Sequence, residues 1–293
     1  MKDESRARET LAERVASRLA SARPAVVEPA PAPAPVAQPV PAEPEPVASG
    51  TPILDISTSR LAAAGFVTPN APPSRLSQEL RVIKRQLLAE AFPHGGRSGG
   101  QGHVIMVTSS MPGEGKTFCS VNLALSLSFE RDIRVLLVDG DSYHHSAGDL
   151  LGAGSHKGLV DLLIEPGVKT RDVLLRTSIP NLTFLPAGRV HPHTTELFSS
   201  KQMAQLVREL SERYPDRVIL IDTPPVLAST EASVLAPLVG QAIVVVEKNR
   251  TSKLGLERTL TLLEGCPNVS CILNMASDDI GIPMHEYYDY GQA

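Results

Sequence analysis

The sequence is poor in aromatic residues and contains no tryptophan. Aromatic side chains make up 4% of its 293 residues, whereas hydrophobic residues make up 42%. A core of ordinary size is therefore expected, filled by valine, leucine, isoleucine and alanine rather than by large rings. The chain also lacks an excess of positive charge, because its formal net charge at pH 7 is −4. We therefore expect no nucleic-acid partner held by bulk electrostatic attraction.

Cysteines and long apolar runs are scarce as well. Cys119, Cys266 and Cys271 have neither the spacing of metal ligands nor an even number, which favours a reducing compartment. The longest apolar run without a charge, 232–246, is interrupted by glycine and glutamine and is too short to span a bilayer. The first residues are charged and lack the apolar segment of a secretion signal. We expect a cytoplasmic chain without a membrane span, held at the inner face of the membrane only where a partner recruits it.

The first 73 residues show no pattern of a packed domain. Residues 1–22 place Leu11, Val15 and Leu19 on one stripe among charged side chains, which predicts a short amphipathic helix. A frayed polar terminus is the alternative. Residues 23–73 begin with a stretch dominated by proline and alanine, which cannot bury a core. We expect 23–73 to be a disordered, extended linker.

The stretch over 104–128 predicts a phosphate-binding site. Residues 104–107 have the pattern of a buried strand and residues 118–128 that of a mostly apolar helix, and the turn between them ends Gly115-Lys116-Thr117. Glycines let backbone N–H groups curl around phosphates, the lysine reaches the β and γ phosphates, and the threonine hydroxyl binds Mg²⁺. The helix N-terminus adds partial positive charge. The alternative is a glycine-rich turn that binds nothing, but it leaves the strand, the Gly-Lys-Thr sequence and the helix in series unexplained.

Two apolar strands downstream end in acidic residues. Residues 133–138 run into Asp139 and Asp141, and residues 218–221 run into Asp222. Strands alternate with helical patterns, which predicts an α/β fold with a mostly parallel sheet and helices on both faces. Ligands bind at the carboxyl edge of such sheets, where these acids are expected. Because buried carboxylates need a cation or a donor, they indicate Mg²⁺; for Asp141, capping of a loop is the alternative.

A domain over 74–276 and a tail over 277–293 follow from the rest of the pattern. A helix with one basic face is expected over 74–88, and the last strand of the domain ends at Asn274. Three of the chain's five tyrosines, Tyr287, Tyr288 and Tyr290, lie in the tail beside acidic residues. Either these rings dock on the domain surface, or they are exposed phenols that accept phosphate.

The order of these motifs resembles the bacterial protein-tyrosine kinases (BY-kinases). A phosphate loop, a strand ending Asp-x-Asp, a strand ending Asp-x-Pro-Pro and a tyrosine cluster follow one another between Ser74 and Tyr290. Within that family the chain looks most like the cytoplasmic tyrosine autokinases encoded with exopolysaccharide export machinery. The resemblance implies the P-loop fold of the partition and cell-division ATPases. Met111 stands where those ATPases carry a signature lysine, which favours the kinase branch.

The resemblance also implies ligands and roles. The implied cofactors are ATP and Mg²⁺, and the implied reaction transfers phosphate from ATP to protein tyrosine. Residues implied to bind the nucleotide are Pro112, Gly113, Glu114, Gly115, Lys116, Thr117, Phe118 and, near the adenine, Asn274. Residues implied in catalysis are Lys116, Asp139, Asp141 and Asp222, and those implied to hold the metal, directly or through water, are Thr117, Asp139 and Asp222. Either Asp139 or Asp141 handles the tyrosine proton, and the sequence does not choose between them.

The implied partners are other copies of the chain, in a homo-oligomer or ring, and the cytoplasmic end of a membrane protein that determines polysaccharide chain length. The implied acceptors are the three tail tyrosines, phosphorylated between neighbouring subunits. Two positions depart from the family. Tyr143 replaces the basic residue after Asp-x-Asp, and the Glu-x-x-Arg-x-x-Arg oligomerisation helix occurs as Gln78-x-x-Arg81-x-x-Lys84. A nucleotide-switch ATPase of the partitioning type and a non-catalytic, nucleotide-binding regulator of polysaccharide export are the alternatives.

Overall fold

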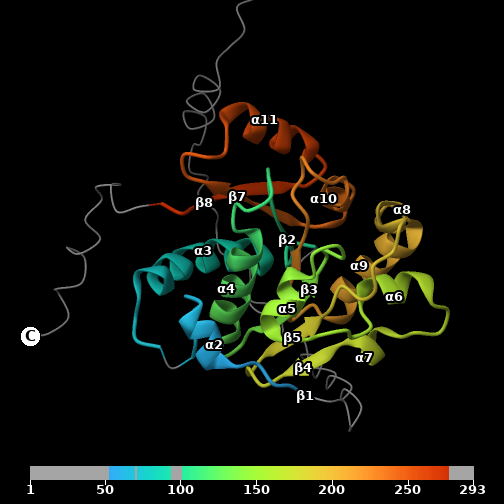
Figure 1. Ribbon diagram of the computed structural model, residues 1–293, viewed down its shortest axis with the longest axis horizontal. Helices are drawn as coiled ribbons and strands as arrows, with labels where there is room; N and C mark the ends of the chain where they lie inside the picture. The colour runs from blue at the N-terminus through green and yellow to red at the C-terminus, as the bar shows by residue number, and fades with distance from the viewer. Residues whose placement is uncertain (1–52, 70, 94–100, 277–293) are drawn as a thin grey trace, which may run out of the picture. The chain divides into compact units, whose positions relative to one another are not determined.

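The computed structural model describes residues 53–69, 71–93 and 101–276 (Figure 1). The helix predicted over 1–22, the linker up to residue 52 and the tyrosine tail lie outside the described residues. Within the described ranges, no helix has the length and apolar character needed to cross a membrane.

Among the described residues, eight strands form one sheet in the order β1-β4-β5-β3-β6-β2-β7-β8. Their bounds are β1 (Ile53–Leu54), β2 (Val104–Ser109), β3 (Arg134–Asp139), β4 (Leu175–Thr177), β5 (Leu182–Leu185), β6 (Arg217–Asp222), β7 (Gln241–Glu247) and β8 (Asn268–Asn274). Neighbouring strands are parallel except for the antiparallel pair β4 and β5. The predicted α/β fold with a mostly parallel sheet is confirmed.

Helices cover both faces of the sheet, as predicted. One face packs against α2 (Thr58–Ala63), α3 (Arg75–Ala91), α4 (Lys116–Ser128) and α5 (Ser146–Leu151). The other packs against α6 (Leu159–Ile164), α7 (Thr170–Val173), α8 (Thr194–Phe198), α9 (Lys201–Arg213), α10 (Glu231–Leu235) with the short 3₁₀ turn η1 (Ala236–Leu238), and α11 (Lys253–Leu262). Figure 1 shows α3 lying beside α4, so the helix that follows the phosphate loop is itself covered.

The central strands read as unbroken apolar runs because both of their faces are covered. All six residues of β2 are buried, as are the last five residues of β3 and of β6. Every residue of α4 from Cys119 to Ser128 is buried too. Complete burial on both faces is typical of parallel sheets in α/β proteins. It holds the ends of β2, β3 and β6, and the start of α4, in fixed positions.

Residues 53–67 belong to the folded domain, which corrects the predicted linker over 23–73. Ile53 of β1 pairs with Arg176 of β4, and Leu61 of α2 is 1% exposed. The backbone N–H of Val67 donates a 2.9 Å hydrogen bond to Oδ1 of Asn122 in α4. A strand of two residues and a helix of six give too little periodicity to be recognised beside a proline-rich stretch.

Candidate functional site

The loop between β2 and α4 turns sharply at two glycines. Gly113 and Gly115 have φ values of 86° and 91°, a left-handed conformation that side chains other than glycine rarely adopt. A Cβ atom on Gly115 would also collide with the side-chain amide of Asn274. α4 begins at Lys116 without a side-chain cap, so the amide groups of its first turn remain oriented toward the loop. This is the geometry of an anion-binding loop.

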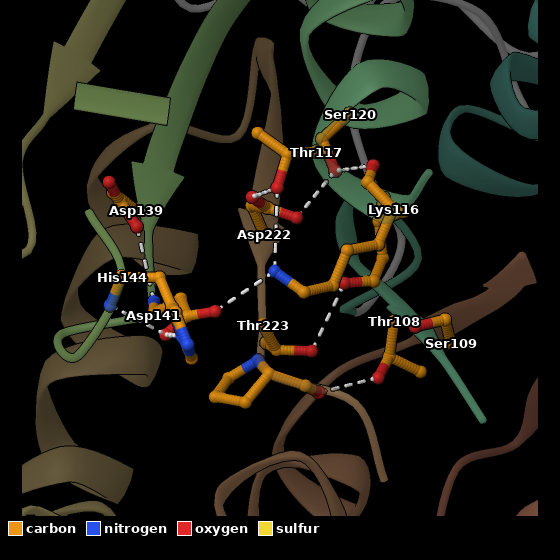
Figure 2. A network of polar contacts seen from close by, with 12 residues as sticks. Thr108, Ser109, Lys116, Thr117, Ser120, Asp139, Asp141, His144, Asp222 and Thr223 are labelled. Carbon is orange, nitrogen blue, oxygen red and sulfur yellow. Dashed lines mark hydrogen bonds and ion pairs between the residues drawn. The ribbon is translucent and has the colours of Figure 1, made fainter. Parts of the chain in front are cut away.

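The predicted acids meet the loop at the carboxyl edge of the sheet (Figure 2). Asp139 ends β3 and lies opposite Asp222, which ends β6. Nζ of Lys116 lies 2.9 Å from Oδ2 of Asp141, and the Thr117 hydroxyl donates a 2.7 Å hydrogen bond to Oδ2 of Asp222. Lys116, Thr117, Asp141 and Asp222 therefore converge on one point, as the sequence predicts.

Three carboxylates share this small volume, and their pKa values differ in direction. Burial raises the pKa of Asp139 to about 7, and the neighbouring charge of Asp222 adds to that effect. Burial also raises the pKa of Asp222, although Lys116 and the Thr117 hydroxyl act in the opposite direction. Burial acts to raise the pKa of Asp141 as well, but its ion pair with Lys116 outweighs burial and the net shift is downward. Burial lowers the pKa of Lys116, but the three acids outweigh it and the net shift is upward. In the free protein Lys116 is therefore positively charged, and Asp141 negatively charged, at neutral pH.

Asp139 and Asp141 face different surroundings. Asp139 is completely buried and accepts hydrogen bonds from the backbone N–H groups of Asp141, at 3.1 Å, and Gly148, at 3.0 Å. Asp141 borders the cleft, and its Oδ1 lies 3.1 Å from Nδ1 of the exposed His144. Asp141 is thus the acid that a ligand in the cleft would meet.

A cleft of about 790 Å³ opens in front of the loop. Its lining includes Gly113, Lys116, Thr117 and Asp141 together with residues 224–231. Tyr143, at the position where the family has a basic residue, also lines the cleft and is 52% exposed. The volume is in the range of small-molecule sites, which indicates room for a nucleotide and part of a second substrate.

Two of the predicted nucleotide-binding residues, Glu114 and Asn274, do not line the cleft. Glu114 is 1% exposed. Asn274 donates a 3.0 Å hydrogen bond from Nδ2 to the carbonyl oxygen of Glu114. Phe118 borders the cleft and packs against Phe66, with ring centroids 4.8 Å apart.

Three further residues take part that the sequence does not single out. The Ser120 hydroxyl contacts Oδ1 of Asp222 at 3.0 Å. The position of Ser120, one helical turn after Lys116, was the only sequence feature that could have indicated this contact. Arg250 and Thr251, which follow β7, contact the phosphate loop through Pro112 and Glu114. No local pattern predicts those two contacts, because only the order of strands brings β7 beside β2.

The oxygen donors suit a magnesium ion bound through few protein ligands. In the part of the chain that the structure describes, no group of three or more histidine, cysteine or acidic side chains is arranged to hold a metal. Mg²⁺ in phosphate-transfer sites needs only one or two protein oxygens, because phosphates and water complete its shell. Thr117 and Asp222, whose oxygens lie 2.7 Å apart, offer such a pair.

A central strand, phosphate loop and helix, with carboxylates on the neighbouring strands, define the class of P-loop NTPase-like α/β domains. Within this class the chain belongs to the family described as AAA domain, which matches residues 102–270.

The chain is also similar to named bacterial kinases. It is 34% identical over 176 residues to the putative tyrosine-protein kinase AmsA of Erwinia amylovora, across 59% of this chain and 24% of AmsA. It is 27% identical over 219 residues to the putative tyrosine-protein kinase CapB of Staphylococcus aureus, across 74% of this chain and 92% of CapB. The crystal structure of the chimerical protein CapA2B2 is 27% identical, with a TM-score of 0.61, across 78% of this chain and 96% of that one.

These similarities confirm the resemblance to bacterial tyrosine kinases that the motif order predicts. The coverage differs between relatives. The chain spans 24% of AmsA and 26% of the tyrosine-protein kinase wzc of Salmonella typhimurium, about a quarter of the length of these curated relatives.

Proposed function

We propose that the protein is an ATP-dependent protein-tyrosine autokinase that phosphorylates its own C-terminal tyrosines between subunits. The observation that carries the proposal is that Lys116, Thr117 and Asp141 line one cleft beside a preformed phosphate loop, with Asp222 bonded to Thr117 directly behind its wall. A cation, a hydroxyl and carboxylates at such a loop are what phosphoryl transfer requires, because that reaction depends on positioning and on charge neutralisation. The tyrosine-kinase names of its relatives support the choice of acceptor.

Each residue at the cleft has a role in this mechanism. Lys116 binds the β and γ phosphates, exchanging its ion pair with Asp141 for the charge of the nucleotide. Thr117 and Asp222 would hold Mg²⁺, which would neutralise charge on the phosphates. Asp139, opposite Asp222 at the ends of β3 and β6, would act on the ion directly or through water. Asn274 is bonded to the carbonyl oxygen of Glu114 in the loop, and by resemblance it would lie near the adenine.

Asp141 is the better candidate to accept or orient the proton of the acceptor tyrosine. It lines the cleft, and the movement of Lys116 from Asp141 to the phosphates would leave its carboxylate free to accept a proton. Asp139 is less suitable because it is completely buried and its carboxylate already accepts hydrogen bonds from two backbone N–H groups. The geometry thus favours one of the two acids that the sequence leaves equivalent.

Tyr287, Tyr288 and Tyr290 are the proposed acceptors, and other copies of the chain the proposed partners. By resemblance to the exopolysaccharide-locus kinases, the protein regulates polysaccharide synthesis or export. The cytoplasmic end of a membrane chain-length-determining protein then recruits it to the inner face of the membrane. Arg81, on the exposed face of α3, is the proposed contact between copies.

Phosphotyrosine mapping after incubation with Mg-ATP tests the proposal. Phosphate is expected on the three tail tyrosines. Lys116→Met should lower it at least about a hundredfold, because the charge that meets the phosphates is lost. Circular dichroism checks that the variant is folded, since Lys116 is ion-paired in the free protein. ATP hydrolysis without phosphotyrosine would indicate a partitioning-type switch instead, and nucleotide binding with neither reaction a non-catalytic regulator.

A further inference from the structure

The phosphate loop is held from outside the cleft by residues of the last third of the domain. Four side-chain contacts reach it from the segment that follows β7, from α11 and from the end of β8. Arg250 donates to the carbonyl oxygen of Pro112 at 3.1 Å, Thr259 to the Ser110 hydroxyl at 2.9 Å, Asn274 to the carbonyl oxygen of Glu114 at 3.0 Å, and Thr251 to the Glu114 carboxylate at 2.5 Å. Glu114 takes part in two of these contacts.

The Glu114 carboxylate joins two parts of the loop to the C-terminal strands. Its Oε2 accepts a 2.9 Å hydrogen bond from the backbone N–H of Met111, which closes the loop on itself. Its Oε1 accepts the Thr251 hydroxyl, and the same hydroxyl oxygen accepts the backbone N–H of Glu247 at 2.9 Å. A carboxylate that is 1% exposed is costly without donors, so loop conformations that break these bonds are disfavoured.

We propose that Glu114 and Thr251 form a positioning pair, which shapes the phosphate loop before a nucleotide arrives and does not itself contact the ligand. The inference rests on the proposed nucleotide site. Binding costs less when the loop amides already point at the phosphates. Thr251 thereby becomes a functional residue of the site although it lies outside the cleft.

The charge of Glu114 does not explain its presence. A negative carboxylate next to an anion-binding loop opposes phosphate binding by Coulomb repulsion. Its contribution is therefore the geometry of its two accepted hydrogen bonds. A glutamine at 114 keeps that geometry if its oxygen faces Met111 and its amide donates to the Thr251 hydroxyl.

Substitution of Thr251 tests the pair in full-length protein. Thr251→Val keeps the shape of the side chain but removes the hydroxyl. It should raise the Kd for Mg-ADP about tenfold and speed amide hydrogen exchange of residues 105–118 in nucleotide-free protein by a similar factor. Thr251→Ser restores the hydroxyl and should restore both quantities. Thr261→Val, the same change at an exposed site of α11, is the matched control and should alter neither.

Substitution of Glu114 separates geometry from charge. Glu114→Gln should keep the Kd within about twofold of wild type, whereas Glu114→Ala should weaken binding about as much as Thr251→Val. The double variant Glu114→Ala with Thr251→Val should be no weaker than the worse single variant, because the two residues act as one unit.

The two proposals fail in different ways. Unchanged loop exchange in Thr251→Val, or additive losses in the double variant, overturns the positioning pair even when wild type binds nucleotide. Wild-type protein that binds no Mg-ADP overturns the nucleotide site, and hydrogen exchange then decides the pair alone.

Discussion

At the scale of single residues, Asp139 is a buried acid whose proton is held unusually tightly. It is completely buried beside Asp222, and its pKa is raised to about 7 from an ordinary value of 3.8. A carboxyl group with a raised pKa binds its proton more tightly in the folded state than in the unfolded state. Its contribution to stability is therefore complete below about pH 4 and is lost as the pH rises through about 7.

We predict that Asp139→Asn removes this pH dependence in nucleotide-free, metal-free protein. The free energy of unfolding of the wild type should decline by up to about 4 kcal/mol between pH 4 and pH 7 on account of Asp139. Asparagine is uncharged like the protonated acid, but its single carbonyl oxygen can accept only one of the N–H groups of Asp141 and Gly148. The variant should therefore be less stable than the wild type near pH 4, and this difference should shrink or reverse by pH 7.5.

Urea denaturation over that pH range measures the difference. Asp149→Asn, at an exposed position of α5, is the control and should leave the slope unchanged. If Asp139→Asn and the wild type lose stability in parallel as the pH rises, the site is not strained by its buried acids.

The sequence predicts that these residues lie together at the carboxyl edge of the sheet, but not the pairings among them. The three acids are identifiable because each follows an apolar run that must be a buried strand. Lys116 and Thr117 are identifiable because they open the helix that follows such a strand. That Lys116 pairs with Asp141 in the free protein, while Asp139 turns to backbone donors, depends on side-chain directions that no sequence pattern encodes. The structural role of Glu114 is not predictable from the sequence either, because its donor, Thr251, lies in the segment that follows β7, far along the chain.

At the scale of secondary-structure elements, two basic residues of α3 differ in their surroundings. Lys84 belongs to the domain itself: its Nζ lies 2.5 Å from Oε1 of Glu130 and 3.3 Å from the carbonyl oxygen of Ser126, and its side chain is 13% exposed. Arg81 is exposed, as is Val82 next to it. The Gln78-x-x-Arg81-x-x-Lys84 pattern therefore combines one residue available to a partner with one that ties α3 to the end of α4.

We predict that Arg81→Ala and Lys84→Ala have separate effects. Arg81→Ala should lower the mass of the assembly without changing the thermal midpoint of the monomer. Lys84→Ala should lower the free energy of unfolding by about 1 kcal/mol, because a partly buried ion pair and a backbone contact are lost. Light scattering and thermal denaturation measure the two quantities.

Arg85→Ala is the matched control, because it removes a positive charge from an exposed position of the same helix outside the pattern. An unchanged mass for Arg81→Ala would show that this face of α3 is only solvated.

Strands and helices differ in how far they are predictable. The central strands and α4 are long and buried on all sides, so their apolar runs reveal them. β1 and α2 are too short to show periodicity, yet the segment that contains them buries Ile56, Leu61 and Val67. The antiparallel β4 has only three residues and likewise gives no signal.

At the scale of the whole molecule, the tail follows directly from the strand that contacts the phosphate loop. β8 ends at Asn274, whose side chain is bonded to Glu114, and Tyr287 follows a short distance along the chain. At roughly 3.3 Å per extended residue, the segment between them can reach the cleft of the same subunit or of a neighbour. The proposed route is transfer to the neighbour.

We predict that phosphorylation of the tail requires two copies. A Lys116→Met chain with intact tyrosines should become labelled when mixed with a chain whose Tyr287, Tyr288 and Tyr290 are replaced by phenylalanine. The initial rate should rise more than linearly with protein concentration, and the mass of the assembly should fall as each phosphate adds up to roughly two negative charges beside Glu286 and Asp289.

Mass spectrometry of the mixed chains reads the site and the extent of labelling. Each chain incubated alone with Mg-ATP is the control, and neither should acquire tail phosphate. A Lys116→Met tail that stays unlabelled, while the wild type labels itself at a rate independent of concentration, would establish transfer within one subunit.

The position of β2 in the sheet has a consequence for the synthesis of the protein. β2 pairs with β6 and β7, where Val104 lies opposite Ile219 and Ile105 opposite Gln241. The partners of β2 are therefore synthesised more than a hundred residues after it. At ordinary translation rates this interval is on the order of ten seconds, during which the apolar β2 and α4 have left the ribosome without their neighbours. The loop contacts from Thr251 and Asn274 come later still. A chain interrupted before residue 241 therefore exposes an unpaired apolar strand to chaperones and to aggregation.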